Sequence, residues 1–186
     1  MIIGFIGYKN SGKSTACNIV KGLIGGGVVQ HNFKDALVAE VRENFSKLLN
    51  EMCLIYDVAL PYKDGHKWEV SDLFKEKPPL MRVLLQEYGT EVRRGDRDDY
   101  WVHQWLSGLS NNGVVLVDDV RFKNEAEAVK SRGGVLIRLV RRDMVNTDSH
   151  QSEVEQDKIV ADHTITTKWG EQSVLESELF KIINGV

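Results

Sequence analysis

The segment that decides the fold reads IIGFI at residues 2–6 and GYKNSGKS at residues 7–14. The first five residues form a short apolar run that ends at a glycine, which is typical of a strand buried in a parallel sheet. The next eight residues match the pattern G-x-x-x-x-G-K-[ST] at every fixed position, and apolar residues recur at helical spacing from Thr15 to Ile24. A strand, a glycine-rich loop and a helix in this order predict a phosphate-binding loop.

This loop has the chemistry of a nucleotide phosphate site. Its glycines let successive backbone N–H groups point at phosphate oxygens, and the start of the following helix adds a partial positive charge. Lys13 would act as a catalytic cation at the β- and γ-phosphates, and the Ser14 hydroxyl would bind Mg²⁺. The competing interpretation is a glycine-rich turn without a chemical role, and the flanking strand and helix argue against it. The ATP-binding residues expected here are Gly7, Asn10, Ser11, Gly12, Lys13, Ser14 and Thr15.

Two acids follow a second apolar strand. Val114 to Val117 is a run of four apolar residues, and Asp118 and Asp119 come directly after it. A carboxylate at a strand tip can hold Mg²⁺ through its water shell, whereas a solvated strand end or a helix N-cap is the alternative role. Beside a phosphate loop the metal role is favoured. We expect Asp119 to hold the metal and Asp118 to be its neighbour.

Length and composition exclude several classes of protein. The chain has 186 residues, which is the length of one domain, and its net charge of −3 gives no global case for binding nucleic acid or a membrane. Cys17 and Cys53 fit no metal-binding spacing and are expected to be reduced. The run from Met1 to Ile6 has no basic start and no cleavage site, and no apolar stretch approaches the ~18 residues that span a bilayer. A cytoplasmic location is the resulting expectation.

Strands and helices alternate along the chain. This alternation predicts a parallel sheet of about five strands, flanked by helices on both faces in three layers. The middle third reads as an insertion beside the sheet, and residues 141–157 form a polar excursion. The expected strands are 2–6, 28–33, 114–117, 135–140 and 163–166, and the expected helices are 15–24, 35–52, 80–88, 99–109, 124–131 and 171–183.

Four further segments carry a family resemblance. They are LLQEYGTE at 84–91, DYWV at 99–102, DVRFKNEA at 119–126 and HQSE at 150–153. Together with the phosphate loop they resemble the deoxynucleoside monophosphate kinases of bacteriophages. The resemblance covers most of the chain, although residues 52–77 match no motif.

The resemblance implies an NMP-kinase-like P-loop fold with an acceptor-binding region at about 34–110 and a lid at about 141–157. It implies transfer of the ATP γ-phosphoryl group to a deoxynucleoside monophosphate (dNMP), giving dNDP and ADP for DNA synthesis. It also implies a homodimer and a phage-encoded protein in a bacterial host. His150 and Glu153 match the family's motif as substrate-binding residues, and Lys168 and Trp169 lie where related kinases receive adenine.

Arginines occur where two phosphate groups would have to be brought together. Guanidinium groups can offset the repulsion between donor and acceptor, so we expect Arg121 and Arg141 to be catalytic and Arg142 to bind ATP from the lid. Arg82 and Arg121 are expected to grip the phosphate of the dNMP, and Arg93 is a further residue expected to bind the dNMP. For any single arginine the alternative is a solvated surface charge.

Three other side chains could contact the acceptor. Gln86 could read a base edge through its amide or could lie on a helix surface. Trp101 could stack on a base or fill the core. Asp35 could bind the sugar or cap its helix.

Two other functions compete with the dNMP kinase. One is a kinase of a hydroxyl acceptor, such as dephospho-coenzyme A, in which Asp35 would take the hydroxyl proton. A phosphate acceptor needs no such base, because it is already largely a dianion at pH 7. The other is a nucleotide-dependent regulatory ATPase, although the number of arginines suits transfer between phosphates better.

Overall fold

The computed structural model describes residues 1–61, 65–110, 112–144 and 150–185, with the backbone alone of Ser152. The chain divides into two compact units, one formed by Met1–Phe33 with Val102–Val186 and the other by Lys34–Trp101. Residues 145–149 of the predicted lid lie outside the described residues. Among the described residues, no helix is both long enough and apolar enough to cross a membrane.

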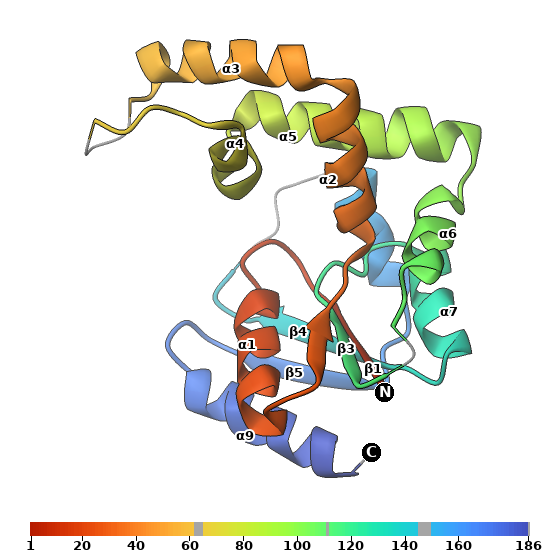
Figure 1. Cartoon of the computed structure of the whole chain (residues 1–186). Helices are drawn as coiled ribbons and strands as arrows, with labels where there is room; N and C mark the ends of the chain where they lie inside the picture. Colours follow the sequence, from red (N-terminus) through yellow and green to blue (C-terminus); the bar gives the residue numbers. More distant parts are fainter. Residues whose placement is uncertain (62–64, 111, 145–149, 186) are drawn as a thin grey trace. The chain divides into compact units, whose positions relative to one another are not determined.

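The first unit is built on the predicted parallel sheet (Figure 1). Its five strands lie in the order β2-β3-β1-β4-β5, and every neighbouring pair is parallel. The central strand β1 is buried along its whole length, as the apolar run predicted. The three-layer α/β fold is therefore confirmed. The strands are β1 Ile2–Ile6, β2 Val28–Gln30, β3 Val114–Val117, β4 Val135–Arg141 and β5 His163–Thr167.

Two hydrophobic cores cover the two faces of this sheet. Phe5 belongs to the core formed with α1 (Lys13–Ile24) and α9 (Gln172–Gly185), whereas the next residue, Ile6, belongs to the core formed with α7 (Lys123–Ser131). This alternation follows from the two-residue period of a strand. The helices of the first unit are α1 Lys13–Ile24, α7 Lys123–Ser131, α8 Gln151–Val154 and α9 Gln172–Gly185, with a 3₁₀ turn at Glu155–Lys158; α6, Tyr100–Ser107, begins in the second unit.

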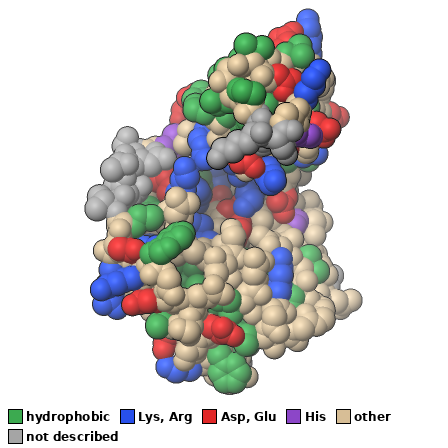
Figure 2. Space-filling view, turned by 90° about the vertical axis from the view of Figure 1, so that its left-hand side faces the viewer, with side chains coloured by type: hydrophobic (Ala, Val, Ile, Leu, Met, Phe, Trp, Pro, Cys, Tyr) green, Lys and Arg blue, Asp and Glu red, His purple; other side chains and the backbone are tan. Residues whose placement is uncertain are grey.

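The described part of the second unit is helical. Its core joins aromatic and aliphatic side chains that include Leu49, Met81 and Trp101. Apolar side chains of α3 are also exposed, among them Leu54 and Val58, and Figure 2 shows hydrophobic side chains on the outer surface of this unit. The elements are α2 Phe33–Asn44, which starts in the first unit, α3 Ser46–Ala59, α4 Val70–Glu76, α5 Pro79–Gln86 and a π-helix at Glu87–Arg94.

The structure corrects the sequence-based elements in three places. The single helix expected at 35–52 is two helices, and the residue between them, Phe45, packs its ring edge-on against Tyr88 at 5.2 Å between centroids. The apolar period continues across this break, so the pattern gave no sign of it. The helix α4 was not predicted, and a capping box of Glu69 and Asp72 starts it. Strand β2 ends at Gln30, and Phe33 already begins α2.

Candidate active site

The loop between β1 and α1 has a backbone that requires glycine at its first position. Gly7 has φ +154°, and a Cβ atom there would lie 2.6 Å from the carbonyl oxygen of Leu139 and 2.5 Å from Ser11 Oγ. Gly12, directly before α1, has φ +99°, which is strained for other residues. The Ser11 hydroxyl is buried and has no hydrogen-bond partner among the described residues. Buried polar groups are normally paired, so a phosphate oxygen fits here as the missing partner.

Lys13 folds back over this loop. Its Nζ donates hydrogen bonds to the carbonyl oxygens of Gly7 at 2.5 Å and Tyr8 at 2.7 Å. The first N–H groups of α1, which starts at Lys13, have no partner within the helix. An ammonium group and the first N–H groups of a helix at one place can bind an anion such as a nucleotide phosphate.

The structure distinguishes the two acids after β3. Ser14 Oγ lies 3.3 Å from Asp118 Oδ2, whereas Asp119 Oδ1 accepts a hydrogen bond from the backbone N–H of Phe33 at 3.1 Å. Asp119 therefore binds the start of α2, which is the helix-cap alternative. Our preference for Asp119 as the metal residue is not supported by this geometry, because the two neighbouring side chains take different directions. The hydroxyl and carboxylate of Ser14 and Asp118 can hold Mg²⁺ together with phosphates and water.

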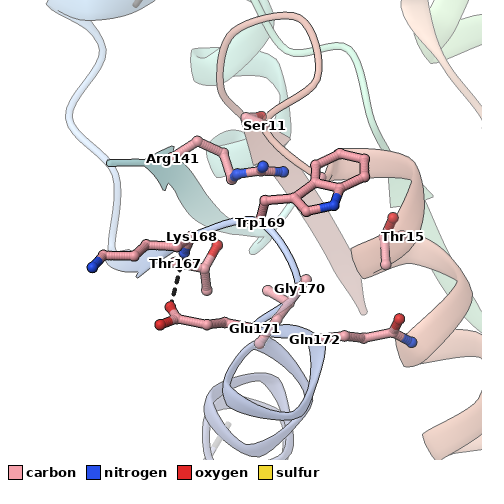
Figure 3. A pocket seen from close by; sticks show the side chains of 11 residues that line it. Ser11, Thr15, Arg141, Thr167, Lys168, Trp169, Gly170, Glu171 and Gln172 are labelled. Carbon is pink, nitrogen blue, oxygen red and sulfur yellow. Dashed lines mark hydrogen bonds between the residues drawn. The ribbon is translucent and has the colours of Figure 1, made fainter. Parts of the chain in front are cut away.

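A cavity of about 260 Å³ lies beside the phosphate loop (Figure 3). The guanidinium of Arg141 lies 4.9 Å from the centre of the Trp169 ring, and Trp169 is 76% exposed. Both groups can stack on a nucleobase. The lining is formed by Ser11, Gly12, Thr15, Arg141, Thr167, Lys168, Trp169, Gly170, Glu171, Gln172 and Leu175.

Asp143 holds Arg141 and Trp169 in place through hydrogen bonds. Its carboxylate accepts hydrogen bonds from Arg141 Nε at 3.2 Å and from the backbone N–H of Trp169 at 2.9 Å. These two contacts lower the pKa of Asp143 to about 2, and the hydrogen bond from Arg141 has the larger effect. Arg141 also donates to the carbonyl oxygen of Asn10 in the loop at 3.4 Å. The neighbouring Arg142 is exposed, and its backbone N–H donates to Thr167.

Arg121, the arginine after β3, belongs to a buried polar network. Its Nη1 forms an ion pair with Glu153, whose side chain is only 4% exposed. Gln156, which the sequence analysis missed, donates its amide to the same carboxylate and accepts the N–H of Gly7. Glu153 thus contacts Arg121 and Gln156 rather than lying open to a ligand. His150 is partly buried, and its carbonyl oxygen accepts the N–H of Glu153 at 2.8 Å.

The second unit holds Arg93 in an aromatic cage. Arg93 Nε donates to Glu40 at 2.9 Å, and its guanidinium lies 5.2 Å from the ring centres of both Tyr88 and Tyr100. Both tyrosine hydroxyls also donate to Glu40, and this bond raises the pKa of Tyr100. The side chain of Arg93 is 33% exposed. Glu40 contacts Arg93 through Nε, and a planar guanidinium can bind a ligand with two acceptor atoms.

The remaining predicted acceptor residues differ in burial. Trp101 is 4% exposed, lies in the core of its unit and donates its indole N–H to Gly89 at 2.8 Å, so stacking on a base is corrected to the core role. Arg82 and Gln86 lie on α5, are partly buried and make no side-chain hydrogen bond or ion pair within the described ranges. Asp35 is exposed in the first turn of α2, where a negative charge favours the helix.

The solved structures similar to this chain are kinases of low sequence identity. A shikimate kinase from Aquifex aeolicus is 15% identical with a TM-score of 0.46, and the match covers 100% of this chain and 98% of that one. A dephospho-CoA kinase from Campylobacter jejuni is 12% identical with a TM-score of 0.42, covering 98% and 95%. A thymidylate kinase from Ehrlichia chaffeensis is 12% identical with a TM-score of 0.39, covering 99% and 98%.

Sequence comparison gives a stronger relationship. No family model matches the chain. A protein of Acanthamoeba polyphaga mimivirus, described as "Putative deoxynucleotide monophosphate kinase", is 30% identical over 169 residues, which are 83% of this chain and 81% of that protein. This relative comes from a virus other than a bacteriophage, so a phage origin of the chain stays a prediction. The chain itself is a P-loop kinase that belongs to the same family as this mimivirus protein.

Proposed function

We propose that the protein transfers the γ-phosphoryl group of ATP to the phosphate of a deoxynucleoside monophosphate. The observation that carries this proposal is the phosphate loop, with Ser14 lying 3.3 Å from Asp118, in a chain related to a deoxynucleotide monophosphate kinase. The bond between the γ-phosphorus and the β,γ-bridging oxygen breaks, and a bond to an oxygen of the acceptor phosphate forms. The products are ADP and a dNDP.

On the donor side, residues of the first unit bind and orient ATP. Loop N–H groups, the Ser11 hydroxyl and Lys13 would surround the phosphates, and Arg141 and Trp169 would bracket the adenine. Ser14 and Asp118 would hold Mg²⁺, which neutralises charge on the β- and γ-phosphates. Lys13 would keep its positive charge where negative charge builds up on the leaving oxygen.

On the acceptor side, we assign the dNMP to the second unit, within the predicted region 34–110. Arg93 supports this assignment because Glu40 and two tyrosines orient its guanidinium, which is still partly exposed. Arg82 and Gln86 are the further candidates on α5. Arg121 would offset the charge of the phosphates between donor and acceptor. The predicted lid at 141–157, which starts with Arg141, would exclude water from ATP.

The direct test is an acceptor screen. The protein is incubated with Mg-ATP and with each of eight ribo- and deoxynucleoside monophosphates, and ADP release is followed. We expect release with at least one dNMP and none with dephospho-coenzyme A. Release that depends on a hydroxyl acceptor, or that needs no acceptor, would instead indicate the hydroxyl kinase or the regulatory ATPase.

Replacing Lys13 tests the phosphate loop. Lys13→Ala removes the cation beside the transferred phosphoryl group, so kcat should fall on the order of 10³-fold or more. Lys9→Ala is the matched control, because Lys9 is an exposed lysine of the same loop at a variable position. We expect the control to keep nearly full activity. A Lys13→Ala protein with near-normal turnover would refute the loop assignment.

Replacing each of the two aspartates after β3 should change a different measured property. Asp118→Asn should raise the Mg²⁺ concentration needed for half-maximal activity and lower kcat, because Asp118 faces Ser14. Asp119→Asn should leave the Mg²⁺ requirement nearly unchanged and reduce the free energy of unfolding by about 0.5–2 kcal/mol through the weakened cap on α2. Magnesium titrations and urea unfolding measure the two effects. The opposite pattern would return the metal role to Asp119.

A charge-conserving change tests Arg93. Arg93→Lys keeps a cation beside Glu40 but removes the planar fork, so KM for the dNMP should rise about 10-fold or more while KM for ATP changes little. Arg97→Lys serves as the control, because Arg97 lies in the same unit and is 55% exposed in a pair with Asp99. If Arg93→Lys instead raises only the KM for ATP, or changes neither the KM for ATP nor the KM for the dNMP, then Arg93 does not bind the acceptor.

A further inference from the structure

Gln156 lies near the end of the predicted lid at 141–157, and the proposed function gives its side chain no role of its own. It is 1% exposed in the 3₁₀ turn at Glu155–Lys158, far in sequence from the phosphate loop. Its Oε1 accepts the backbone N–H of Gly7 at 3.1 Å. Its Nε2 donates to the carbonyl oxygen of Glu153 at 2.9 Å and to Glu153 Oε2 at 3.1 Å. One side-chain amide therefore joins the first residue of the loop to a buried carboxylate.

The carboxylate of Glu153 carries this connection on to Arg121. Glu153 Oε1 pairs with Arg121 Nη1, and the remaining oxygen accepts from Gln156. A buried charge is stable only when it is paired and hydrogen-bonded, so the guanidinium and the amide hold the carboxylate together. The backbone N–H of Arg121 is held as well, because Glu125 Oε2 accepts it at 2.8 Å. Both the backbone and the guanidinium of Arg121 thus have fixed positions.

The amide group suits this position better than any other side chain. The N–H of Gly7 needs an acceptor, whereas Glu153 needs a donor, and a primary amide supplies both at every pH. The turn itself is anchored, because Arg138 Nη2 donates to the carbonyl oxygens of Gln156 at 2.8 Å and Ile159 at 2.7 Å. Gln156 therefore connects the loop to Arg121 through a rigid support.

We propose that Gln156 is a positioning residue that fixes the phosphate loop and the guanidinium of Arg121 relative to each other. It acts through Gly7 on the donor phosphates and through Glu153 on Arg121. This inference rests on the proposed function for its catalytic consequence, but the hydrogen-bonded connection also has a consequence for ATP binding alone.

A double-mutant cycle tests the connection. Gln156→Leu leaves the N–H of Gly7 and one oxygen of Glu153 unpaired, so kcat should fall about 10-fold or more and the Kd for Mg-ATP should rise several-fold. In an Arg121→Ala background the same change should lower kcat by no more than about 2-fold, because the arginine that it positions is gone. Gln30→Leu is the control, since Gln30 is a partly buried glutamine of β2 that also loses a side-chain hydrogen bond, here with Lys21, but lies outside the phosphate loop and the lid.

Replacing Gln156 by glutamate, which has nearly the same shape, should make kcat depend on pH. Gln156→Glu places a second carboxyl group beside Glu153, and two carboxyls at hydrogen-bond distance share a proton. The other charged groups nearby are Arg121, Arg138 and Asp157, which accepts a hydrogen bond from Tyr8. Once protonated, the introduced carboxyl can both accept from Gly7 and donate to Glu153. The kcat of Gln156→Glu relative to the native protein should therefore rise at least about 5-fold from pH 8 to pH 6.

The outcomes separate the two claims. If the native protein phosphorylates no dNMP, the proposed function is wrong. The role of Gln156 is then tested by ATP binding alone, through the Kd for Mg-ATP of Gln156→Leu. An unchanged Kd and kcat in Gln156→Leu would overturn the inference. The inference would also be wrong if Gln156→Leu lowered kcat equally in the native and the Arg121→Ala backgrounds and if the relative kcat of Gln156→Glu did not rise at pH 6. Gln156 would then only support the fold.

Discussion

The geometry of the site depends on the close approach of the Gly7 backbone to β4. A Cβ atom at residue 7 would lie 2.6 Å from the carbonyl oxygen of Leu139, so a larger residue would push the loop away from the sheet. With glycine there, β1 runs straight into the loop, and the loop runs straight into α1. The Ser11 hydroxyl, which has no partner in the described part of the chain, and the ammonium of Lys13 then lie beside the start of a helix, where an anion is stabilised.

The parallel sheet assembles the rest of the first unit's site. Because all strands run in the same direction, the segments that follow them leave the sheet at one edge. Asp118 follows β3 and meets Ser14 of the loop, whereas Arg141 ends β4 and meets Trp169 from the segment after β5. Residues far apart in the sequence are thus brought together at the ends of parallel strands. The side chain of Gln156 adds a hydrogen-bonded connection between Gly7 of the loop and Glu153.

The sequence predicts well those features that depend on neighbouring residues. The phosphate loop and the strand β3 were predicted at their observed positions, because glycine spacing and apolar runs are local signals. The direction of the Asp118 and Asp119 side chains could not be predicted, since both follow the same strand. Gln156 carried no motif, and its role depends on contacts with Gly7 and Glu153 that only the folded chain brings together. The burial of Trp101 is likewise a tertiary property.

The central claim is that one chain binds a phosphate donor and a phosphate acceptor for direct transfer between them. Calorimetry with a linked ligand tests this most directly, using adenosine joined through five phosphates to the deoxynucleoside of the best acceptor. Binding of one ligand per chain, in the presence of Mg²⁺ and about 100-fold tighter than ATP, is predicted, because the second site is filled without further loss of translational freedom. Binding no tighter than that of ATP would contradict the account.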